Sequence, residues 1–391
     1  MTGDRPTVRD LPATADVVVV GGGVIGCSLA CHLARAGQRV VLLERETLGS
    51  QSTGRCAGGV RQQFSTELNV RMQRYSVARL EHFEEEIGHP LEFRQIGYLF
   101  LLTEGTQVAS FRQQFEMWHR LGLTDSRWLS PDDAQRLSPA ITVDDVLAAT
   151  FCPSDGIASP VDVTDGYAAA ARRAGATVVE GCAVTGIEVR GDRVCGVRTS
   201  RRAISTQLVI NAAGPWAGRV AALAGVELPV EPYPRHVFVT EAAPAVARDN
   251  PMTIDMTSSF YFHPEGEGIL FGMGERDERP TFEQRVDPGF LEKVAAVAEA
   301  RLPLLLDLGI RTSWVGLYEV TPDHQPFLGP LDEVEGLWCA CGFSGHGFQM
   351  APAVGHLLTQ WILEGGSDLD LGPFSPGRRQ TGAWTAEQNV V

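Results

Sequence analysis

Apolar stretches near the N-terminus predict a strand, a helix and a second strand in direct succession. A short run of β-branched residues, VVVV at 17–20, favours a strand. Ile25, Leu29 and Leu33 then recur at helical spacing until Gly37, a residue suited to ending a helix. The next apolar run, RVVLLE, ends in Glu44. This order is typical of the first unit of a Rossmann-like domain.

The glycines between the first strand and the helix indicate a dinucleotide ligand. Gly21, Gly23 and Gly26 form GxGxxG, and Glu44 follows Gly21 by 23 residues. Glycines permit a tight turn and a close approach of the backbone to a pyrophosphate, while the helix N-terminus offers free N–H groups. The acid can accept hydrogen bonds from a ribose. A strand, glycines, a helix, a second strand and an acid in one unit are far more specific than the glycines alone.

Two further features favour FAD over NAD. A long loop rich in Gly, Ser and Thr, with Arg55 and Arg61, follows at residues 48–64, where an NAD domain would continue with another helix and strand. The segments QLVINAAGPWAG and EGLWCACGFSGHGF each repeat the pattern of an apolar strand followed by small residues. Three strand ends that converge on one long ligand suit FAD. The candidate cofactor-binding residues in the first two of these regions are Gly21, Gly23, Val24, Ile25, Gly26, Glu44, Arg45, Ser50, Ser52, Thr53, Cys56, Ala57, Gly58, Gly59, Ala213, Gly214 and Trp216.

The rest of the chain predicts two interleaved domains with an α/β (α+β overall) fold. A Rossmann-like FAD-binding domain is expected at 1–90, 150–230 and 312–375, and includes a hairpin at 184–199. A mostly antiparallel β-sheet substrate domain is expected at 91–149 and 231–311, with strands QIGYLFLL, HVFVTE, FYFHPE and GILFGMG. Helices are expected at 67–87 and 290–302. Residues 376–391 show no periodicity, and a disordered tail is expected there.

Composition and charge narrow the function classes. The net charge of −15 argues against nucleic acid as a partner. The eight cysteines contain no CxxC pair, which favours reduced thiols in the cytoplasm over a zinc site or a disulfide framework, and no metal is implied. The polar N-terminal stretch lacks the features of a signal peptide, and no apolar run approaches a membrane span in length.

Three motifs give the chain a family resemblance. They are STGRCAGGVRQQF, GLYEVTPDHQPFLG and CGFSGHGFQMAPAVG. With them the chain resembles the FAD-dependent D-amino acid oxidase superfamily over roughly residues 15–370, in the branch of sarcosine oxidase, glycine oxidase and dimethylglycine dehydrogenase. Within this branch the chain resembles the beta subunits of heteromeric sarcosine oxidase and dye-linked L-proline dehydrogenase. The match is specific for the family and only weakly informative about the substrate.

The resemblance implies roles for particular residues. Arg61 matches a carboxylate-binding arginine, and Tyr318 and Tyr261 match tyrosines near the substrate. Each also has an ordinary alternative, as a surface arginine or a core tyrosine. Val184 would begin a strand near the adenine. The loop CGFSGHGFQM would approach the flavin, followed by a helix from about 351 to 364. Its candidate residues are Gly342, Phe343, Gly345, His346, Gly347, Phe348 and Gln349.

Departures from the family pattern bear on the chemistry. Gly316 stands where covalent sarcosine oxidases carry a flavin-bonding cysteine, so we expect non-covalent FAD. Gln349 replaces a lysine that helps to bind the substrate carboxylate. Leu270 stands near the place of the lysine that promotes reaction with oxygen, and the single lysine, Lys293, lies in a predicted helix. A positive charge beside the flavin stabilises superoxide. Its absence favours an acceptor other than oxygen, unless Arg or His takes its place.

The expected function is FAD-dependent oxidation of an amino acid or N-alkyl amino acid to an imine by hydride transfer to the flavin, with Arg61, Tyr318, His346, Tyr261 and Gln349 at the substrate. One alternative is an oxidase that produces peroxide. A second is an FAD-carrying subunit that passes electrons to a partner subunit. A third is a flavoprotein that has lost catalysis and acts as a binding module.

Overall fold

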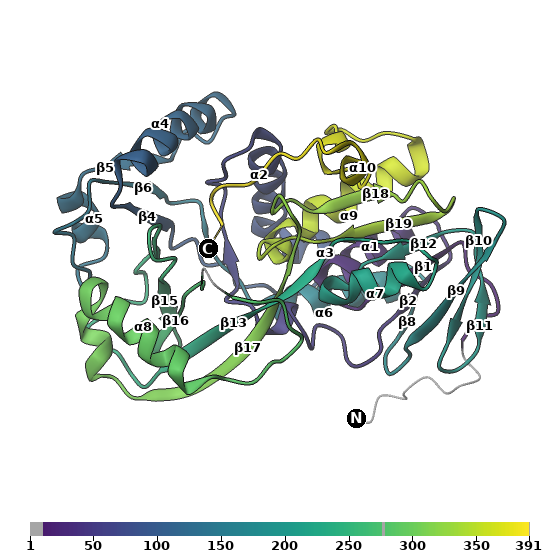
Figure 1. Ribbon diagram of the computed structural model, residues 1–391, viewed down its shortest axis with the longest axis horizontal. Coiled ribbons are helices and arrows are strands. Elements are labelled where there is room, and N and C mark those ends of the chain that lie inside the picture. Colours follow the sequence, from purple (N-terminus) through teal and green to yellow (C-terminus); the bar gives the residue numbers. More distant parts are fainter. Residues whose placement is uncertain (1–10, 276–277, 391) are drawn as a thin grey trace.

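A six-stranded sheet forms one half of the molecule. The computed structural model describes residues 11–275 and 278–390 (Figure 1). In this sheet β18 is antiparallel to its neighbour and the other pairs are parallel. The strand order is β18 (Phe327–Pro330), β19 (Leu337–Cys341), β12 (Val209–Asn211), β1 (Val17–Val20), β2 (Val40–Leu43) and β8 (Thr177–Val179). The expected convergence of three strand ends is therefore confirmed, because β19, β12 and β1 are adjacent.

Both faces of the six-stranded sheet are covered. Val17 and Val19 of β1 pack against a helical layer, while Val18 and Val20 pack on the opposite face. The helical layer consists of α1 (Val24–Arg35), α2 (Glu67–Glu81), α3 (Phe83–Ile87), α6 (Pro160–Arg173) and α9 (Gly347–Glu364). The opposite face carries α7 (Ala217–Ala222) and a three-stranded sheet of β9 (Val184–Arg190), β10 (Arg193–Thr199) and β11 (Ala203–Ser205). The expected hairpin at 184–199 is β9–β10, with Gly191 at φ +65° in its turn.

An eight-stranded sheet forms the other half, with β14 and β4 as its parallel pair. Its order is β17 (Ile310–Val320), β13 (Glu231–Thr240), β16 (Gly268–Gly272), β15 (Tyr261–Glu265), β14 (Met252–Asp255), β4 (Tyr98–Leu102), β6 (Ala148–Cys152) and β5 (Arg127–Leu129). Phe238 of β13 faces α8 (Pro288–Arg301), and Val237 and Val239 face the opposite side. That opposite side also packs against α4 (Gly105–Arg120).

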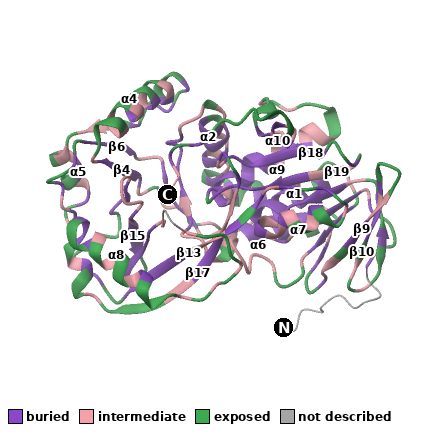
Figure 2. Cartoon of the chain, viewed as in Figure 1, coloured by how far each residue is buried: buried purple, intermediate pink, exposed green. Residues whose placement is uncertain are grey.

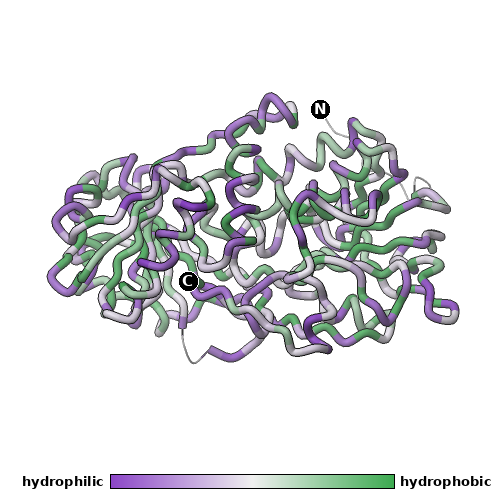
Figure 3. Tube along the Cα trace, turned by 90° about the horizontal axis from the view of Figure 1, so that it is seen from above, coloured by the Kyte–Doolittle hydropathy of each residue, from purple (hydrophilic) through white to green (hydrophobic). Residues whose placement is uncertain are grey.

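Two long strands run between the halves of the molecule, and several short elements complete the fold. Figure 1 shows the long strands β13 and β17 running from one half of the molecule to the other. Figure 2 shows buried strands in the interior of both halves, and Figure 3 shows hydrophobic stretches of the chain in both halves. The remaining elements are β3 (Gly59–Val60), β7 (Gly156–Ile157), α5 (Pro131–Leu137), α10 (Arg378–Thr381), η2 (Thr53–Arg55), η3 (Gly214–Trp216), η4 (Pro303–Asp307) and η5 (Gly372–Phe374). Among the described residues, no helix is long and apolar enough to span a membrane.

The sheet boundaries differ from the expected ranges. β17 lies wholly in the eight-stranded sheet, where it pairs with β13 along its length, although the expected boundary at 312 cut through it. β6 likewise pairs with β4 across the expected boundary at 150. Local sequence pattern carries no information on which sheet a strand joins. Residues 1–10 of the expected FAD-binding range, 276–277 of the expected substrate range and 391 lie outside the described residues.

Three helices differ from the predicted ranges in their limits. The helix expected at 67–87 is divided into α2 and α3 at His82, whose backbone leaves the helical region at φ −109° and ψ 20°. α9 begins at Gly347, one turn before the expected start at 351. The helix expected at 290–302 is α8.

The expected disordered tail is wrong for the described residues 376–390. α10 lies within it, and Glu387 and Asn389 are buried. The Glu387 carboxylate accepts hydrogen bonds from the Ser65 backbone and the Asn69 side chain, each at 2.8 Å. These contacts join residues more than 300 positions apart, so a search for local periodicity misses them.

Candidate active site

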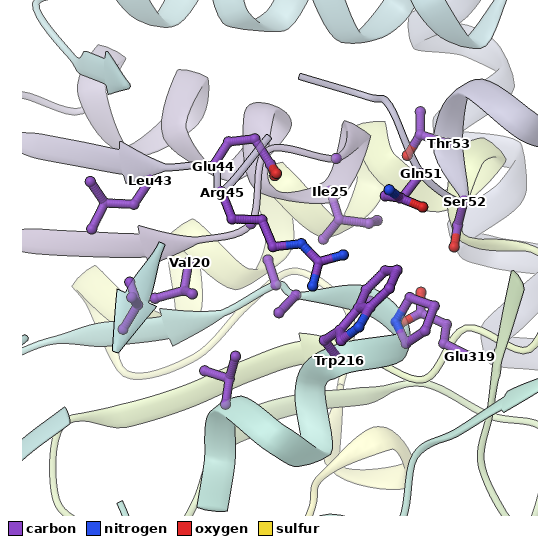
Figure 4. Close-up of a pocket in the computed structure, with 18 of the residues that line it drawn as sticks. Val20, Ile25, Leu43, Glu44, Arg45, Gln51, Ser52, Thr53, Trp216 and Glu319 are labelled. Carbon is purple, nitrogen blue, oxygen red and sulfur yellow. The ribbon is translucent and has the colours of Figure 1, made fainter. Parts of the chain in front are cut away.

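A cavity lies at the carboxyl ends of β1, β2 and β12 (Figure 4), the usual ligand position in an open α/β sheet. We call it the glycine-loop cavity. Of the residues proposed from sequence, those lining it are Gly21, Gly23, Val24, Ile25, Glu44, Arg45, Ser50, Ser52, Thr53, Val184, Ala213, Gly214 and Trp216.

The glycine turn is held in a shape that larger residues could not adopt. Gly21 has φ +114°, and a Cβ there would lie 2.3 Å from the Ala212 carbonyl oxygen. Gly26 does not line the cavity; a Cβ there would lie 2.0 Å from the Gly21 oxygen, so its role is to let α1 approach β1. The first turn of α1 has no side-chain cap at Gly23, and its N–H groups suit an anion. One of them, the N–H of Val24, donates to Thr53 Oγ1 at 3.2 Å.

Polar groups in this cavity fit an extended dinucleotide. The Glu44 carboxylate is fixed by the N–H groups of Gly22 (2.7 Å) and Glu46 (2.8 Å), at the place where a ribose would bind. Ser50 Oγ is buried and has no hydrogen-bond partner among the described residues. The Arg45 guanidinium lies 3.8 Å from the centre of the Trp216 ring, and Figure 4 shows this pair at the cavity wall.

A second cavity adjoins the first and lies against the eight-stranded sheet. We call it the tyrosine cavity, after Tyr98, Tyr261 and Tyr318 in its lining. Ser52 lines both cavities, and its hydroxyl donates to the Leu317 carbonyl at 2.7 Å. The residues proposed from sequence that line it are Ser52, Cys56, Ala57, Gly58, Gly59, Arg61, Tyr261, Tyr318, Gly345, His346, Phe348 and Gln349. Residues of all three motifs, together with Tyr261 of β15, therefore meet in one place.

Arg61 is buried in this cavity and its terminal nitrogens are engaged. Nη1 donates to the Gln63 carbonyl at 2.8 Å, and Nη2 donates to the Asn389 carbonyl. The guanidinium stacks 3.9 Å from the centre of the Phe64 ring. Gln349 Oε1 accepts from the Arg61 backbone N–H at 2.6 Å, so it contacts this segment and not the guanidinium. Burial lowers the pKa of Arg61.

His346 is neutral in this setting. Burial lowers its pKa to about 3, and the nearby positive charge of Arg61 acts in the same direction. Nε2 is buried without a hydrogen-bond partner in the part of the chain that the structure describes. Burial also raises the pKa of Tyr261 and Tyr318, which keeps both phenols protonated. The proposed histidine and tyrosines are thus neutral polar groups.

Four residues proposed from sequence line neither cavity: Gly26, Gly342, Phe343 and Gly347. Phe343 is buried in the core beneath α9. Gly342 has φ +79°, and its N–H donates to Glu319 Oε2 at 2.9 Å. Gly347 begins α9. Gly342, Phe343 and Gly347 flank the loop that carries Gly345 and His346, whereas Gly26 lies in α1.

Sequence reasoning missed several lining residues. Arg235 and Tyr98 line the tyrosine cavity, as does Val390 from the C-terminal segment, and Glu319 lines the glycine-loop cavity. A signal for Arg235 was present, because it shares one face of β13 with Val237 and Val239 in an otherwise apolar alternation. The sequence contained no signal that Val390 would line a cavity.

The chain belongs to the FAD dependent oxidoreductase family, whose sequence profile matches residues 16–361. FAD is accordingly its cofactor, and the geometry of the glycine-loop cavity fits it.

Particular relatives share most of this chain. Human mitochondrial dimethylglycine dehydrogenase is 33% identical, over 96% of this chain and 45% of the human protein. Human mitochondrial sarcosine dehydrogenase is 32% identical, over 93% of this chain and 41% of the human protein. The chain spans less than half the length of these two relatives. FAD-dependent oxidoreductase domain-containing protein 1 of Xenopus laevis is 33% identical, over 100% of this chain and 86% of that protein.

Solved structures show the same architecture. L-proline dehydrogenase from P. horikoshii superposes with a TM-score of 0.90 at 34% identity, covering 96% of this chain and 100% of that one. Glycine oxidase from Geobacillus kaustophilus superposes with a TM-score of 0.83 at 26% identity, covering 94% and 99%.

Proposed function

We propose that the protein oxidises the C–N bond of an amino acid or N-alkyl amino acid to an imine. The observation that carries this proposal is the sharing of Ser52 by two cavities, one suited to a dinucleotide and one buried and polar. FAD would lie in the glycine-loop cavity and supply the hydride acceptor. The substrate would occupy the tyrosine cavity.

The charge of the tyrosine cavity supports an anionic substrate that carries a neutral amine. Among its described lining residues are three arginines, Arg55, Arg61 and Arg235, and no Asp or Glu. Such a lining favours a carboxylate and disfavours an ammonium group. An amine must be neutral to lose hydride from its α-carbon, so the same charges that hold the carboxylate would help to deprotonate the nitrogen.

The names of the relatives agree with this substrate class. Dimethylglycine, sarcosine, proline and glycine all carry an amine one carbon from a carboxylate. The buried lining would keep water from the reacting centre. We propose that Arg61, Tyr318, His346, Tyr261 and Gln349 surround the substrate, with Tyr318 and Tyr261 as hydrogen-bond donors.

We further propose an electron acceptor other than oxygen. Leu270 is buried beside Val237 and Val239 and adds no charge near the cavity. Lys293 lies on α8, which covers the face of the eight-stranded sheet opposite the tyrosine cavity, and it forms an ion pair with Glu275. The arginines of the cavity are the cations that could still promote a reaction with oxygen.

The test is anaerobic bleaching of the flavin absorbance by a panel of sarcosine, N-methyl amino acids, L- and D-proline, glycine and D-amino acids. We expect at least one member to bleach the flavin, with slow recovery in air and rapid recovery with an artificial acceptor. Rapid recovery with peroxide would make the protein an oxidase. If no amine bleaches the flavin, the proposed substrate class is wrong for this chain alone, and a missing partner subunit becomes the alternative.

A further inference from the structure

The tyrosine cavity contains three arginines. Arg61 uses both terminal nitrogens, whereas Arg55 and Arg235 bond through Nη1, and of these two it is Arg235 whose Nε is buried without a partner among the described residues. Arg55 Nη1 donates to the Val315 carbonyl at 3.0 Å and to the Gln284 side chain. Arg61 gives both terminal nitrogens to backbone carbonyls, as described above. The hydrogen bonds of Arg235 are made by Nη1, to the Pro234 carbonyl at 2.8 Å and to Glu278.

Arg235 makes its hydrogen bonds through Nη1, which leaves the edge of the guanidinium formed by Nε and Nη2 available to a ligand. Its side chain is 17% exposed, and its Nε is buried with no hydrogen-bond partner among residues 11–275 and 278–390. A buried, unpaired N–H on a charged group is costly, and a native site normally supplies a partner for it. The edge formed by Nε and Nη2 matches the two oxygens of a carboxylate side-on.

The fold directs Arg235 toward the proposed substrate position. Arg235 is paired in register with Gly316 of β17, which has no side chain to cover it. Its guanidinium lies 4.7 Å from the centre of the Tyr318 ring, a diagonal neighbour on the same face of the sheet. Tyr318, Tyr261 and Arg235 therefore line one wall of the cavity.

Arg61 is suited to a different task. Its contacts with Gln63 and Asn389 connect the loop after β3 to the C-terminal segment. Moving the guanidinium onto a substrate would break a bond that holds that segment. Arg61 therefore positions the wall of the cavity.

We propose that Arg235 is the residue that binds the substrate carboxylate, through its Nε–Nη2 edge, with Glu278 as the fixed counter-ion on Nη1. This inference rests on the proposed function, since it assumes a substrate with a carboxylate. It also accounts for the glutamine at position 349, because a carboxylate held on β13 does not need a cation at the start of α9.

The test compares two probes that differ in one charge. Methylthioacetate has a thioether in place of the amine and cannot form an imine, and methylthioacetamide is its neutral counterpart. Binding of each to the FAD-loaded protein is measured by calorimetry. We expect the unaltered protein to prefer the carboxylate by about tenfold or more. Equal binding of both probes would contradict the proposed substrate class itself, and the Arg235 assignment would fall with it.

Given that preference, Arg235→Met should weaken methylthioacetate binding about 30-fold and amide binding less than about threefold. Arg61→Met and Arg55→Met are the matched controls, and each should keep the preference for the carboxylate. Loss of the preference in Arg61→Met, with its retention in Arg235→Met, would overturn the proposal. FAD content and thermal melting verify that each variant is folded.

Two further variants test the proposal even if Arg235→Met fails to fold. Arg235→Lys keeps the charge but loses the planar fork, so we expect an intermediate loss of about three- to tenfold. Glu278→Gln removes the negative charge beside the guanidinium and leaves Arg235 itself unmutated. It should tighten methylthioacetate binding about threefold or more. Unchanged or weaker carboxylate binding in Glu278→Gln would contradict the proposed geometry.

Discussion

At the scale of single residues, small side chains leave the room that the polar ones occupy. A Cβ on Gly345 would lie 2.3 Å from Tyr318 Cε2, so only glycine lets the tyrosine ring lie against this loop. Gly316, paired with Arg235, has no side chain of its own, and the Arg55 backbone packs close to it. His346, between Gly345 and Gly347, is buried and kept neutral by its surroundings. The site therefore contains permanent positive charge on its arginines and neutral polar groups around them.

The buried His346 predicts a pH dependence of stability. The unfolded chain takes up a proton at this histidine as the pH falls below its ordinary pKa of 6.5, whereas the folded state resists protonation down to about 3. Stability is therefore lost as the pH falls through this window, by about 2 kcal/mol at pH 5. His346→Gln should remove this pH-dependent loss of stability. The melting temperature of the variant should therefore fall less between pH 7 and pH 5 than that of the unaltered protein.

The control for this prediction is His82→Gln, because the His82 side chain is 56% exposed. The melting temperature of this variant should depend on pH in the same way as that of the unaltered protein. An unchanged slope in His346→Gln would mean that the imidazole is protonated in the folded state, contrary to the burial that we describe.

At the scale of elements, the C-terminal segment acts as part of the site. Asn389 donates to the Gln63 carbonyl at 3.2 Å and to Gln114 at 2.7 Å, which connects the segment to both halves of the molecule. Its own carbonyl accepts from Arg61. Figure 1 shows the chain ending between the two halves. An element without regular secondary structure thus closes one side of the tyrosine cavity.

Glu387 is the anchor of this segment, which gives a second prediction. Glu387→Ala would leave the Ser65 N–H without its acceptor and the Asn69 amide with Gln325 as its remaining acceptor, at a cost of about 2–3 kcal/mol. We expect a lower melting temperature and faster proteolysis near the C-terminus. Thr385→Ala, at an exposed position of the same segment, should behave like the unaltered protein. Equal protease resistance of both variants would show that Glu387 does not hold the segment in place.

At the scale of the whole molecule, the cofactor would join the two large sheets. The glycine-loop cavity belongs mainly to the six-stranded sheet, and the tyrosine cavity lies against the eight-stranded one. A ligand that extends through both cavities would contact residues of both large sheets. The relative placement of the sheets therefore decides the distance between cofactor and substrate.

We predict that this cofactor is held without a covalent bond. Gly316 supplies no sulfur to bond the flavin, and a side chain there would have its Cβ 3.1 Å from the Arg55 carbonyl oxygen, a tight contact that a cysteine could form only if its neighbours shifted. Burial raises the pKa of the Cys56 thiol, which lines the tyrosine cavity, to about 11, so it is a poor nucleophile at neutral pH. Acid precipitation should release all flavin into the supernatant, and flavin absorbance in the washed pellet would disprove the prediction.

The sequence alone predicted the features that depend on local chain geometry. The glycine turn, the acid after β2, the hairpin of β9 and β10 and the approach of three strand ends all follow from short patterns with fixed spacing. Backbone shape and strand position are set by neighbouring residues, and such patterns report them directly. The motif CGFSGHGFQM, through its resemblance to the family, singled out His346 and Gln349, and both line the tyrosine cavity.

Only the tertiary structure decided which side chains share a partner. Arg61 and Asn389 are 328 residues apart, and Arg235 and Glu278 are 43 apart, with strands β14, β15 and β16 between them in the sequence. Contacts between distant parts of the chain also place β17 in the eight-stranded sheet and bury the C-terminal segment. Such contacts depend on how whole layers pack, and no local pattern encodes them. The choice among the three arginines of the cavity therefore became possible only once their hydrogen-bond partners could be compared.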